Sequence, residues 1–166
     1  MMTTEDAYFF DSDCLLGLFI ETAGFEEIRH LFSETGFVYS SWVILADTLA
    51  ILKEHLEMGR IDAERYQECV HKFFSYLRLS EIRLVDIVSE GGECCTLGSY
   101  DYPLTNILRR HPFLDAAKAL RLLALKTCMI TLSSRHPKLR LVTSDTTLLQ
   151  AALLEGIPTH PIQAGD

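Results

Sequence analysis

Short runs of consecutive apolar residues alternate along this chain with longer segments in which apolar residues recur every three or four positions. The runs at residues 7–10, 37–40 and 139–143 are short and largely apolar, as strands buried on both faces are. Residues 81–88 alternate between apolar and polar positions, and residues 157–162 form a last extended segment. The pattern therefore predicts a sheet built from these five segments.

The segments between the predicted strands have helical period. Residues 41–58 and 62–79 predict two long helices, and Asp62 is placed to cap the second one. The same period predicts shorter or later helices at residues 15–20, 25–34, 114–134 and 146–154. Ser12 or Asp13 is expected to cap the first of these. Because helices alternate with strands, the chain is predicted to be an α/β protein with a mostly parallel sheet.

Composition limits the chain to one ordinary globular domain, which we expect to span residues 1–166. Apolar residues make up 48% and charged residues 23%, which suits a folded protein with a sizeable core. The chain has no apolar stretch of the roughly 18 residues that a membrane helix needs, and its start lacks the basic region of a secretory signal. A cytoplasmic location without membrane contact is therefore expected.

One predicted segment, residues 89–102, is glycine-rich and is expected to be irregular and to lie beside a site. It contains Cys94 and Cys95, which could be a redox or soft-metal pair or an incidental loop pair. The five cysteines are an odd number without Cys-x-x-Cys spacing, so neither a disulfide framework nor a zinc site is expected.

The net charge of −8 conceals a basic region in the second half of the chain. Eight bases lie between residues 109 and 140, and such a region can attract phosphate groups. The candidates for RNA binding are Arg109, Arg110, Lys118 and Arg121. Each of them could equally lie on a solvated helix face.

Four aspartates carry the strongest indication of chemistry. Asp11 and Asp145 each end an apolar run, and the carboxyl ends of parallel strands form the edge where such sheets bind ligands. Asp47 and Asp115 lie near the starts of predicted helices and could point at the same edge. Gathered carboxylates repel one another, so their convergence would favour a divalent metal ion.

Each aspartate also has a structural interpretation. Asp115 could favour the dipole of its helix, and Asp145 could cap the helix that begins at residue 146. Asp47 is more informative, because it interrupts the apolar side of its helix, where an unpaired charge is costly to bury.

Four segments of the chain combine acids with strands and helices in a recurring way. Residues 9–16 read Phe-Phe-Asp-Ser-Asp-Cys-Leu-Leu, an apolar strand that ends on an acid and leads into a helix. Ala-Asp at residues 46–47 and Asp-Ala-Ala at residues 115–117 fall in helices. Residues 141–145 read Leu-Val-Thr-Ser-Asp and precede a helix, a glycine and a final strand. Together these segments resemble the pattern of PIN domains, and the resemblance spans nearly the whole chain.

This resemblance implies a three-layer α/β/α fold and an acidic cluster that binds Mg²⁺ or Mn²⁺ and cleaves RNA. It assigns the catalytic and metal-binding positions to Asp11, Asp47, Asp115 and Asp145, with Asp11 and Asp115 as principal ligands. Ser12 and Thr143 would orient these carboxylates, and Asp13 would support them. Many PIN domains are VapC-like toxins of prokaryotic VapBC toxin–antitoxin pairs, so an antitoxin protein is an expected partner. The mean hydropathy of +0.14 also suits an apolar homodimer surface.

Two features depart from the family pattern. Asp47 stands where the family usually has Glu, so ligation by its shorter side chain could become water-mediated. The stretch from Asp115 to Asp145 is also longer than in compact toxin members. The rival hypothesis is a non-catalytic PIN-like module that binds RNA or a protein. A receiver- or hydrolase-like domain is a third interpretation, but the sequence has no GxGxxG, GxxxxGK[ST] or GxSxG motif.

Overall fold

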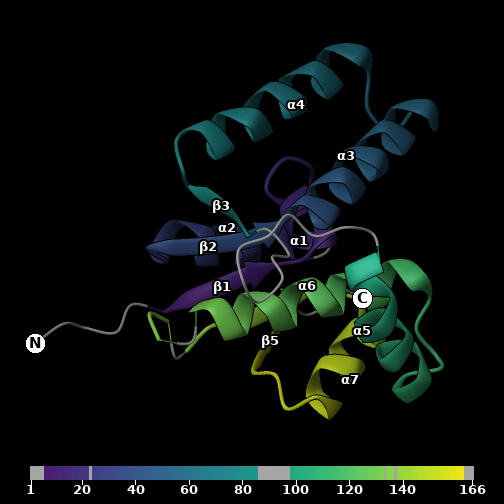
Figure 1. Ribbon diagram of the computed structural model, residues 1–166. Helices are drawn as coiled ribbons and strands as arrows, with labels where there is room; N and C mark the ends of the chain where they lie inside the picture. Colours follow the sequence, from purple (N-terminus) through teal and green to yellow (C-terminus); the bar gives the residue numbers. More distant parts are fainter. Residues whose placement is uncertain (1–5, 23, 86–97, 133, 137, 163–166) are drawn as a thin grey trace, which may run out of the picture.

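A five-stranded parallel sheet forms the centre of the molecule (Figure 1). The computed structural model describes residues 6–22, 24–85, 98–132, 134–136 and 138–162. Within these residues the strands lie in the order β3-β2-β1-β4-β5. They are β1 (Ala7–Phe10), β2 (Phe37–Ser41), β3 (Ile82–Val85), β4 (Arg140–Thr143) and β5 (Thr159–Pro161). The predicted α/β class with a parallel sheet is confirmed.

Helices connect these strands and form the outer layers. They are α1 (Ser12–Gly17), α2 (Phe25–Glu34), α3 (Trp42–Glu57), α4 (Ala63–Arg78), α5 (Gly98–Arg110), α6 (Ala116–Leu132) and α7 (Thr146–Leu154). Because parallel crossovers are right-handed, the helices after β1 and β2 belong to one face of the sheet, and those after β3 and β4 to the other. Figure 1 shows α6 lying across the front of the sheet. The architecture therefore has three layers, α/β/α, as expected.

Strand β1 lies in the middle of the sheet and carries Asp11 to its carboxyl edge. All four residues of β1 are buried, because β2 and β4 pair with it on either side and helices cover both faces. The register places Phe10 opposite Val142, so Asp11 and Thr143 become neighbours where the two strands end. After β1 the chain continues to β2 on one side, and after β4 it continues to β5 on the other side. The carboxyl ends of two such neighbouring strands are the usual ligand-binding position in open parallel sheets.

Most predicted helices agree with the structure. Residues 146–154 form α7 as predicted, and α4 has its N-cap at Asp62, whose Oδ1 accepts a hydrogen bond from Arg65 N at 2.7 Å. The long helix predicted over residues 41–58 is α3, and the one over residues 114–134 is α6. The boundaries of these helices differ by at most two residues, as expected where helix ends fray, whereas the helix predicted over residues 15–20 is α1 and begins and ends three residues earlier.

The segment predicted to be irregular is partly helical. Residues 86–97, which include Cys94 and Cys95, lie outside the described residues, but α5 begins at Gly98 and was not predicted. The glycines favoured a loop, whereas apolar residues at helical spacing later in the segment favour a helix. Ile107 is 2% exposed, and Leu104 and Leu108 pack against the same core, so tertiary burial decides the structure of this segment.

The cap predicted for the first helix was wrong. Helix α1 begins at Ser12 and has Asp11 as its N-cap residue, and no side-chain hydrogen bond closes this cap. The physical reason is that the carboxylate of Asp11 is engaged by side chains of β4 and α6, described below. Its contacts therefore serve the edge of the sheet and leave the helix terminus without a side-chain cap.

Two further features concern the whole fold. Among the described residues, no helix is long and apolar enough to cross a bilayer. Cys14, Cys69 and Cys128 are buried free thiols, and burial raises the pKa of Cys128 to about 12. These three cysteines therefore behave as core residues.

Candidate functional site

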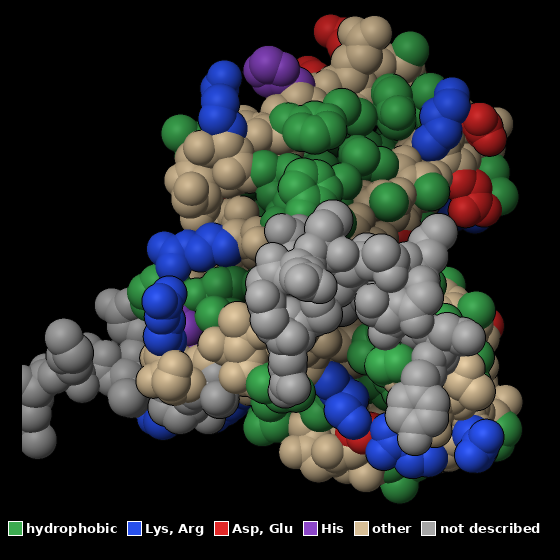
Figure 2. Space-filling view, viewed as in Figure 1, with side chains coloured by type: hydrophobic (Ala, Val, Ile, Leu, Met, Phe, Trp, Pro, Cys, Tyr) green, Lys and Arg blue, Asp and Glu red, His purple; other side chains and the backbone are tan. Residues whose placement is uncertain are grey.

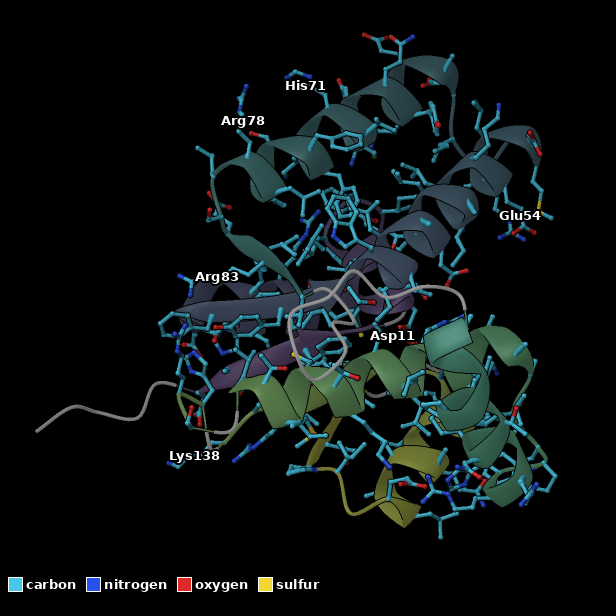
Figure 3. The ribbon with its side chains drawn as sticks, in the orientation of Figure 1. Asp11, Glu54, His71, Arg78, Arg83 and Lys138 are labelled. Carbon is cyan, nitrogen blue, oxygen red and sulfur yellow. The ribbon has the colours of Figure 1, made fainter. Side chains whose placement is uncertain are left out.

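Asp11 is the central acid of the site. It is fully buried where β1 ends and α1 begins, beside α6 (Figure 3). Its Oδ2 accepts hydrogen bonds from Thr143 Oγ1 at 3.2 Å and from Arg121 Nη1 at 3.2 Å. The backbone N–H of Ser12 donates a further hydrogen bond to it. Groups from β4, α6 and α1 thus compensate for the burial of this carboxylate.

Arg121, on α6, joins Asp11 to Asp47, on α3. Its Nη1 lies 3.2 Å from Asp11 Oδ2 and its Nη2 lies 3.0 Å from Asp47 Oδ2. The second contact is a charge contact without hydrogen-bond geometry, so Asp47 Oδ2 is buried with no hydrogen-bond partner in the described part of the chain. Arg121 Nε is likewise buried and unpaired there. One guanidinium is therefore shared by two carboxylates and does not satisfy all their hydrogen bonds.

Burial dominates the protonation of Asp11. Burial, and after it the negative charge of Asp13, raises the pKa of Asp11 to about 7, although Arg121, Ser12 and Thr143 oppose the shift. The pKa of Arg121 is raised, because the charges of Asp11 and Asp47 outweigh its burial. The charged form of Asp11 is therefore disfavoured, and a further positive charge nearby would lower its pKa again.

Asp145 lies beside these groups and has two sets of contacts. Its Oδ1 accepts hydrogen bonds from Thr147 N at 3.0 Å and Leu148 N at 3.1 Å, which makes it the N-cap of α7. Lys118 Nζ lies 2.9 Å from its Oδ2. Burial opposes ionisation, but hydrogen bonds from Thr147 and Lys118 outweigh it, and the pKa of Asp145 is lowered. The sequence-based capping hypothesis for Asp145 is therefore confirmed.

Asp13 ties the two strand ends together. Its Oδ2 accepts hydrogen bonds from the backbone N of Ser144, at 2.8 Å, and from the Ser144 hydroxyl. Because Ser144 follows β4 and Asp13 follows β1, these bonds hold the β1–α1 and β4–α7 turns against each other. The supporting role expected of Asp13 towards the other acids stays a prediction. We refer to Asp11, Asp13, Asp47 and Asp145, together with Lys118 and Arg121, as the acid site.

Asp115 has a different environment. It is exposed just before α6, and its Oδ1 accepts a hydrogen bond from Lys118 N at 2.8 Å, as an N-cap residue does. Among the described residues, no group of three or more His, Cys, Asp or Glu side chains is placed to hold a metal ion. The convergence of all four predicted acids on one metal therefore stays a prediction.

The bases predicted to bind RNA divide into two pairs. Lys118 and Arg121 turn towards the acid site, whereas Arg109 is exposed and Arg110 Nη1 lies 3.1 Å from Glu155 Oε1. The spacing of three residues between Lys118 and Arg121 indicated that the two share one side of their helix, but not what that side contacts. RNA binding by these bases stays a prediction.

The donor set of the acid site fits a divalent cation. Mg²⁺ usually binds one or two carboxylates directly and completes its coordination with water. Asp11 and Asp47 offer two carboxylates within reach of one guanidinium, and Asp47 Oδ2 is a buried oxygen that lacks a hydrogen bond. These two residues can hold such a cation once the Arg121 side chain moves from between them.

Comparisons with known proteins concern the fold. No protein-family model and no curated protein matches the sequence. The structure resembles that of PAE2754 from Pyrobaculum aerophilum, with a TM-score of 0.56, 14% identity, and coverage of 93% of this chain and 83% of that one. It also resembles VapBC2 from Rickettsia felis, solved bound to a DNA fragment from their promoter. The TM-score is 0.57 at 11% identity, covering 95% of this chain and 99% of that one. VapC proteins are PIN domains, so these matches support a PIN-like fold.

Proposed function

We propose that this chain is a ribonuclease that hydrolyses RNA phosphodiester bonds with Mg²⁺ or Mn²⁺ at the acid site. The observation that carries the proposal is the meeting of Asp11 and Asp47 on one guanidinium at the carboxyl edge of β1. Two carboxylates that contact the same guanidinium repel each other, and a bound cation would make their proximity favourable. When bound, the metal ion would lower the pKa of a water molecule and shield the phosphate charge.

The chain's own residues orient this site. Thr143 Oγ1 donates to Asp11 and also accepts a hydrogen bond from Asp145 N at 3.0 Å, so one hydroxyl positions both strand ends. Asp145 and the exposed Asp115 would hold metal-bound waters or a second ion. Lys118 lies on α6 and contacts both of these acids, and it would attract the phosphate of the substrate.

Loss of cleavage in site variants tests the proposal. Wild-type protein incubated with structured RNA and Mn²⁺ is expected to cleave it, and Asp11→Asn and Asp47→Asn are expected to lose at least about a hundredfold in rate. Asp62→Asn is the matched control, because Asp62 caps α4 and takes no part in the acid site. Equal cleavage by wild type and Asp11→Asn would indicate a contaminating nuclease and contradict the proposal.

A second candidate function is a non-catalytic PIN-like module that binds RNA or a protein. The observation in its favour is that Asp11, Asp47 and Asp145 each already contact a base, Arg121 or Lys118, without any metal ion. The same protein samples distinguish the two functions. RNA retention on a filter in EDTA, without cleavage in Mn²⁺, would favour the binding module.

We further propose a protein partner of the antitoxin type and a cytoplasmic location, by extension from the VapBC2 neighbour. Figure 2 shows apolar side chains gathered over the upper part of the view, where Figure 1 has α3, α4 and β3. There a pocket of about 530 Å³ is lined by Trp42, Phe74, Leu77 and Leu84, among other residues, and Trp42 is 56% exposed. Exposed apolar area of this kind suits a protein contact.

The partner proposal has a direct test. Expression of the chain alone is expected to arrest growth, and co-expression of the product of an adjacent gene is expected to relieve the arrest. Sedimentation of the purified chain alone would show whether it also forms the expected homodimer.

A further inference from the structure

The space between Asp11 and Asp47 is occupied by a positive charge that belongs to the protein. Arg121 places one nitrogen 3.2 Å from Asp11 and the other 3.0 Å from Asp47. Its side chain is 12% exposed, so solvent screens these contacts only weakly. A metal ion bound by both carboxylates would need the same oxygens and would meet the guanidinium at close range.

The fit of the guanidinium to this position is incomplete. Arg121 Nε is buried without a hydrogen-bond partner, and Asp47 Oδ2 receives charge but no hydrogen bond, within the part of the chain that the structure describes. A structural ion pair gains most when it forms two parallel hydrogen bonds with one carboxylate. Here each carboxylate contacts a single nitrogen of the guanidinium, so displacing Arg121 is expected to cost less free energy than breaking a bidentate ion pair.

We propose that Arg121 is an internal competitor of the divalent cation and sets the metal affinity of the acid site. The proposal rests on the metal site of the proposed function, and it names the residue that regulates that site. With Arg121 between them, Asp11 and Asp47 have a counter-charge, so the protein can fold without a metal ion. Metal binding requires the guanidinium to leave, and the two events oppose each other by the same factor.

Lys118 serves a different acid and is not part of this competition. Its Nζ contacts Asp145 and Thr147 Oγ1, the latter at 2.6 Å, which strengthens the start of α7. Because Arg121 alone bridges two carboxylates among the described contacts, its removal is expected to change metal affinity more than removal of Lys118.

The test is Mn²⁺ titration by calorimetry on EDTA-treated, dialysed protein. Arg121→Gln removes the competing charge and is expected to bind Mn²⁺ at least about tenfold more tightly than wild type. Arg121→Lys keeps the charge but places it on one nitrogen in place of the two that contact Asp11 and Asp47 separately, so its affinity is expected to lie between the two. Lys138→Gln is the matched control for net charge, since Lys138 lies at the far end of the sheet from Asp11 (Figure 3). Its affinity is expected to equal that of wild type.

Thermal melting gives a second readout that does not depend on activity. Without metal, Arg121→Gln is expected to melt below wild type, because Asp11 and Asp47 lose their counter-charge. Saturating Mn²⁺ is expected to raise its melting temperature by more than that of wild type. If Arg121→Gln does not fold in EDTA, Arg121→Lys decides the question by the same two measurements.

The outcomes separate this inference from the proposed function. Unchanged or weaker Mn²⁺ binding in folded Arg121 variants would overturn the competition, even if wild type cleaves RNA. Tighter binding in the variants without RNA cleavage by any protein would support the competition and contradict the nuclease. Absence of Mn²⁺ binding from wild type and all variants would overturn the inference, because Arg121 would then not be what limits the affinity.

Discussion

Helix α6 supplies bases to two buried charge clusters that differ in their balance of charge. At the acid site, Lys118 and Arg121 contact Asp11, Asp47 and Asp145, and Asp13 adds a fourth negative charge. At the other, the Glu155 cluster, a single carboxylate that is 7% exposed meets Lys126, His111 and Arg110. His111 Nε2 lies 2.7 Å from Glu155 Oε1, and Lys126 contacts Oε2. The acid site has an excess of acids, and the Glu155 cluster has an excess of bases.

The pKa values of the two acids reflect this difference. Burial raises the pKa of Asp11 to about 7, and its one arginine does not offset this. Burial acts in the same direction on Glu155, but hydrogen bonds from Lys126 and His111 outweigh it and lower the pKa of Glu155. A buried acid with sufficient partners stabilises a fold, whereas one with too few is typical of a functional site. The comparison therefore favours the acid site as the place of function.

The largest expected difference between the clusters is in the pH dependence of stability. Because the pKa of Asp11 is raised from 3.8 to about 7, the unfolded state loses its proton first, and stability falls as pH rises through this interval. At about 1.4 kcal/mol per pKa unit, the loss is on the order of 4 kcal/mol. Urea unfolding in EDTA at pH 4 to 8 is expected to show this fall in wild type and not in Asp11→Asn. Parallel pH profiles for the two proteins would contradict the raised pKa.

Removal of the acid from the Glu155 cluster is expected to lower stability at neutral pH, because the charged form of Glu155 stabilises the fold. Glu155→Gln leaves Lys126 without its counter-charge and should lower the free energy of unfolding by about 2–3 kcal/mol at pH 7, since Lys126 is partly exposed. Because the pKa of Glu155 is lowered, the contribution of its charge is present above pH 4.5 and is lost as pH falls further. Denaturant unfolding at pH 7 and pH 4 measures both. A variant as stable as wild type at pH 7 would show that this cluster is not structural.

A smaller effect separates the two roles of Asp145. Asp145→Ala removes the N-cap of α7, and Asp62→Ala removes the N-cap of α4, and each should cost about 1 kcal/mol of stability. The two variants should differ in Mn²⁺ affinity, which we expect to fall in Asp145→Ala alone. Equal Mn²⁺ affinities in calorimetry would restrict Asp145 to capping.

The smallest effect is expected at an exposed ion pair outside both clusters. Lys53 Nζ lies 3.6 Å from Glu57 Oε1 on α3, and both side chains are more than half exposed. Lys53→Ala should change the free energy of unfolding by less than about 0.5 kcal/mol, because solvent screens the pair. A change above 1 kcal/mol in urea unfolding would show that Lys53 contributes more than a screened ion pair, for which its position 5.8 Å from the centre of the Tyr66 ring offers a cause.

The fold was predictable from the sequence to a greater extent than the site. Apolar runs and helical spacing identified the strands and most of the helices, because both record burial directly. Helix α5 escaped prediction, because the burial of Ile107 depends on tertiary contacts that glycine-rich surroundings conceal. The acids Asp11 and Asp145 were recognisable from their positions at strand ends.

The pairing of acids with bases was not predictable. Arg121 lies 110 residues from Asp11 in sequence, and Lys118 lies 27 residues from Asp145. Both bases looked like surface residues of a basic region that could attract phosphate. Only the packing of α6 against the carboxyl edge of the sheet turns them towards the acids, and such long-range orientation leaves no local pattern in the sequence.

The contact between Thr143 and Asp11 has a consequence for the order of synthesis. The two residues are 132 positions apart, so Asp11 leaves the ribosome long before its partners on α6 and β4 exist. Contacts of such wide sequence separation form late in folding, after the loop-closure entropy has been overcome. A nascent chain that has not reached β4 therefore carries Asp11 without its site, and the site assembles only after β4 has been synthesised.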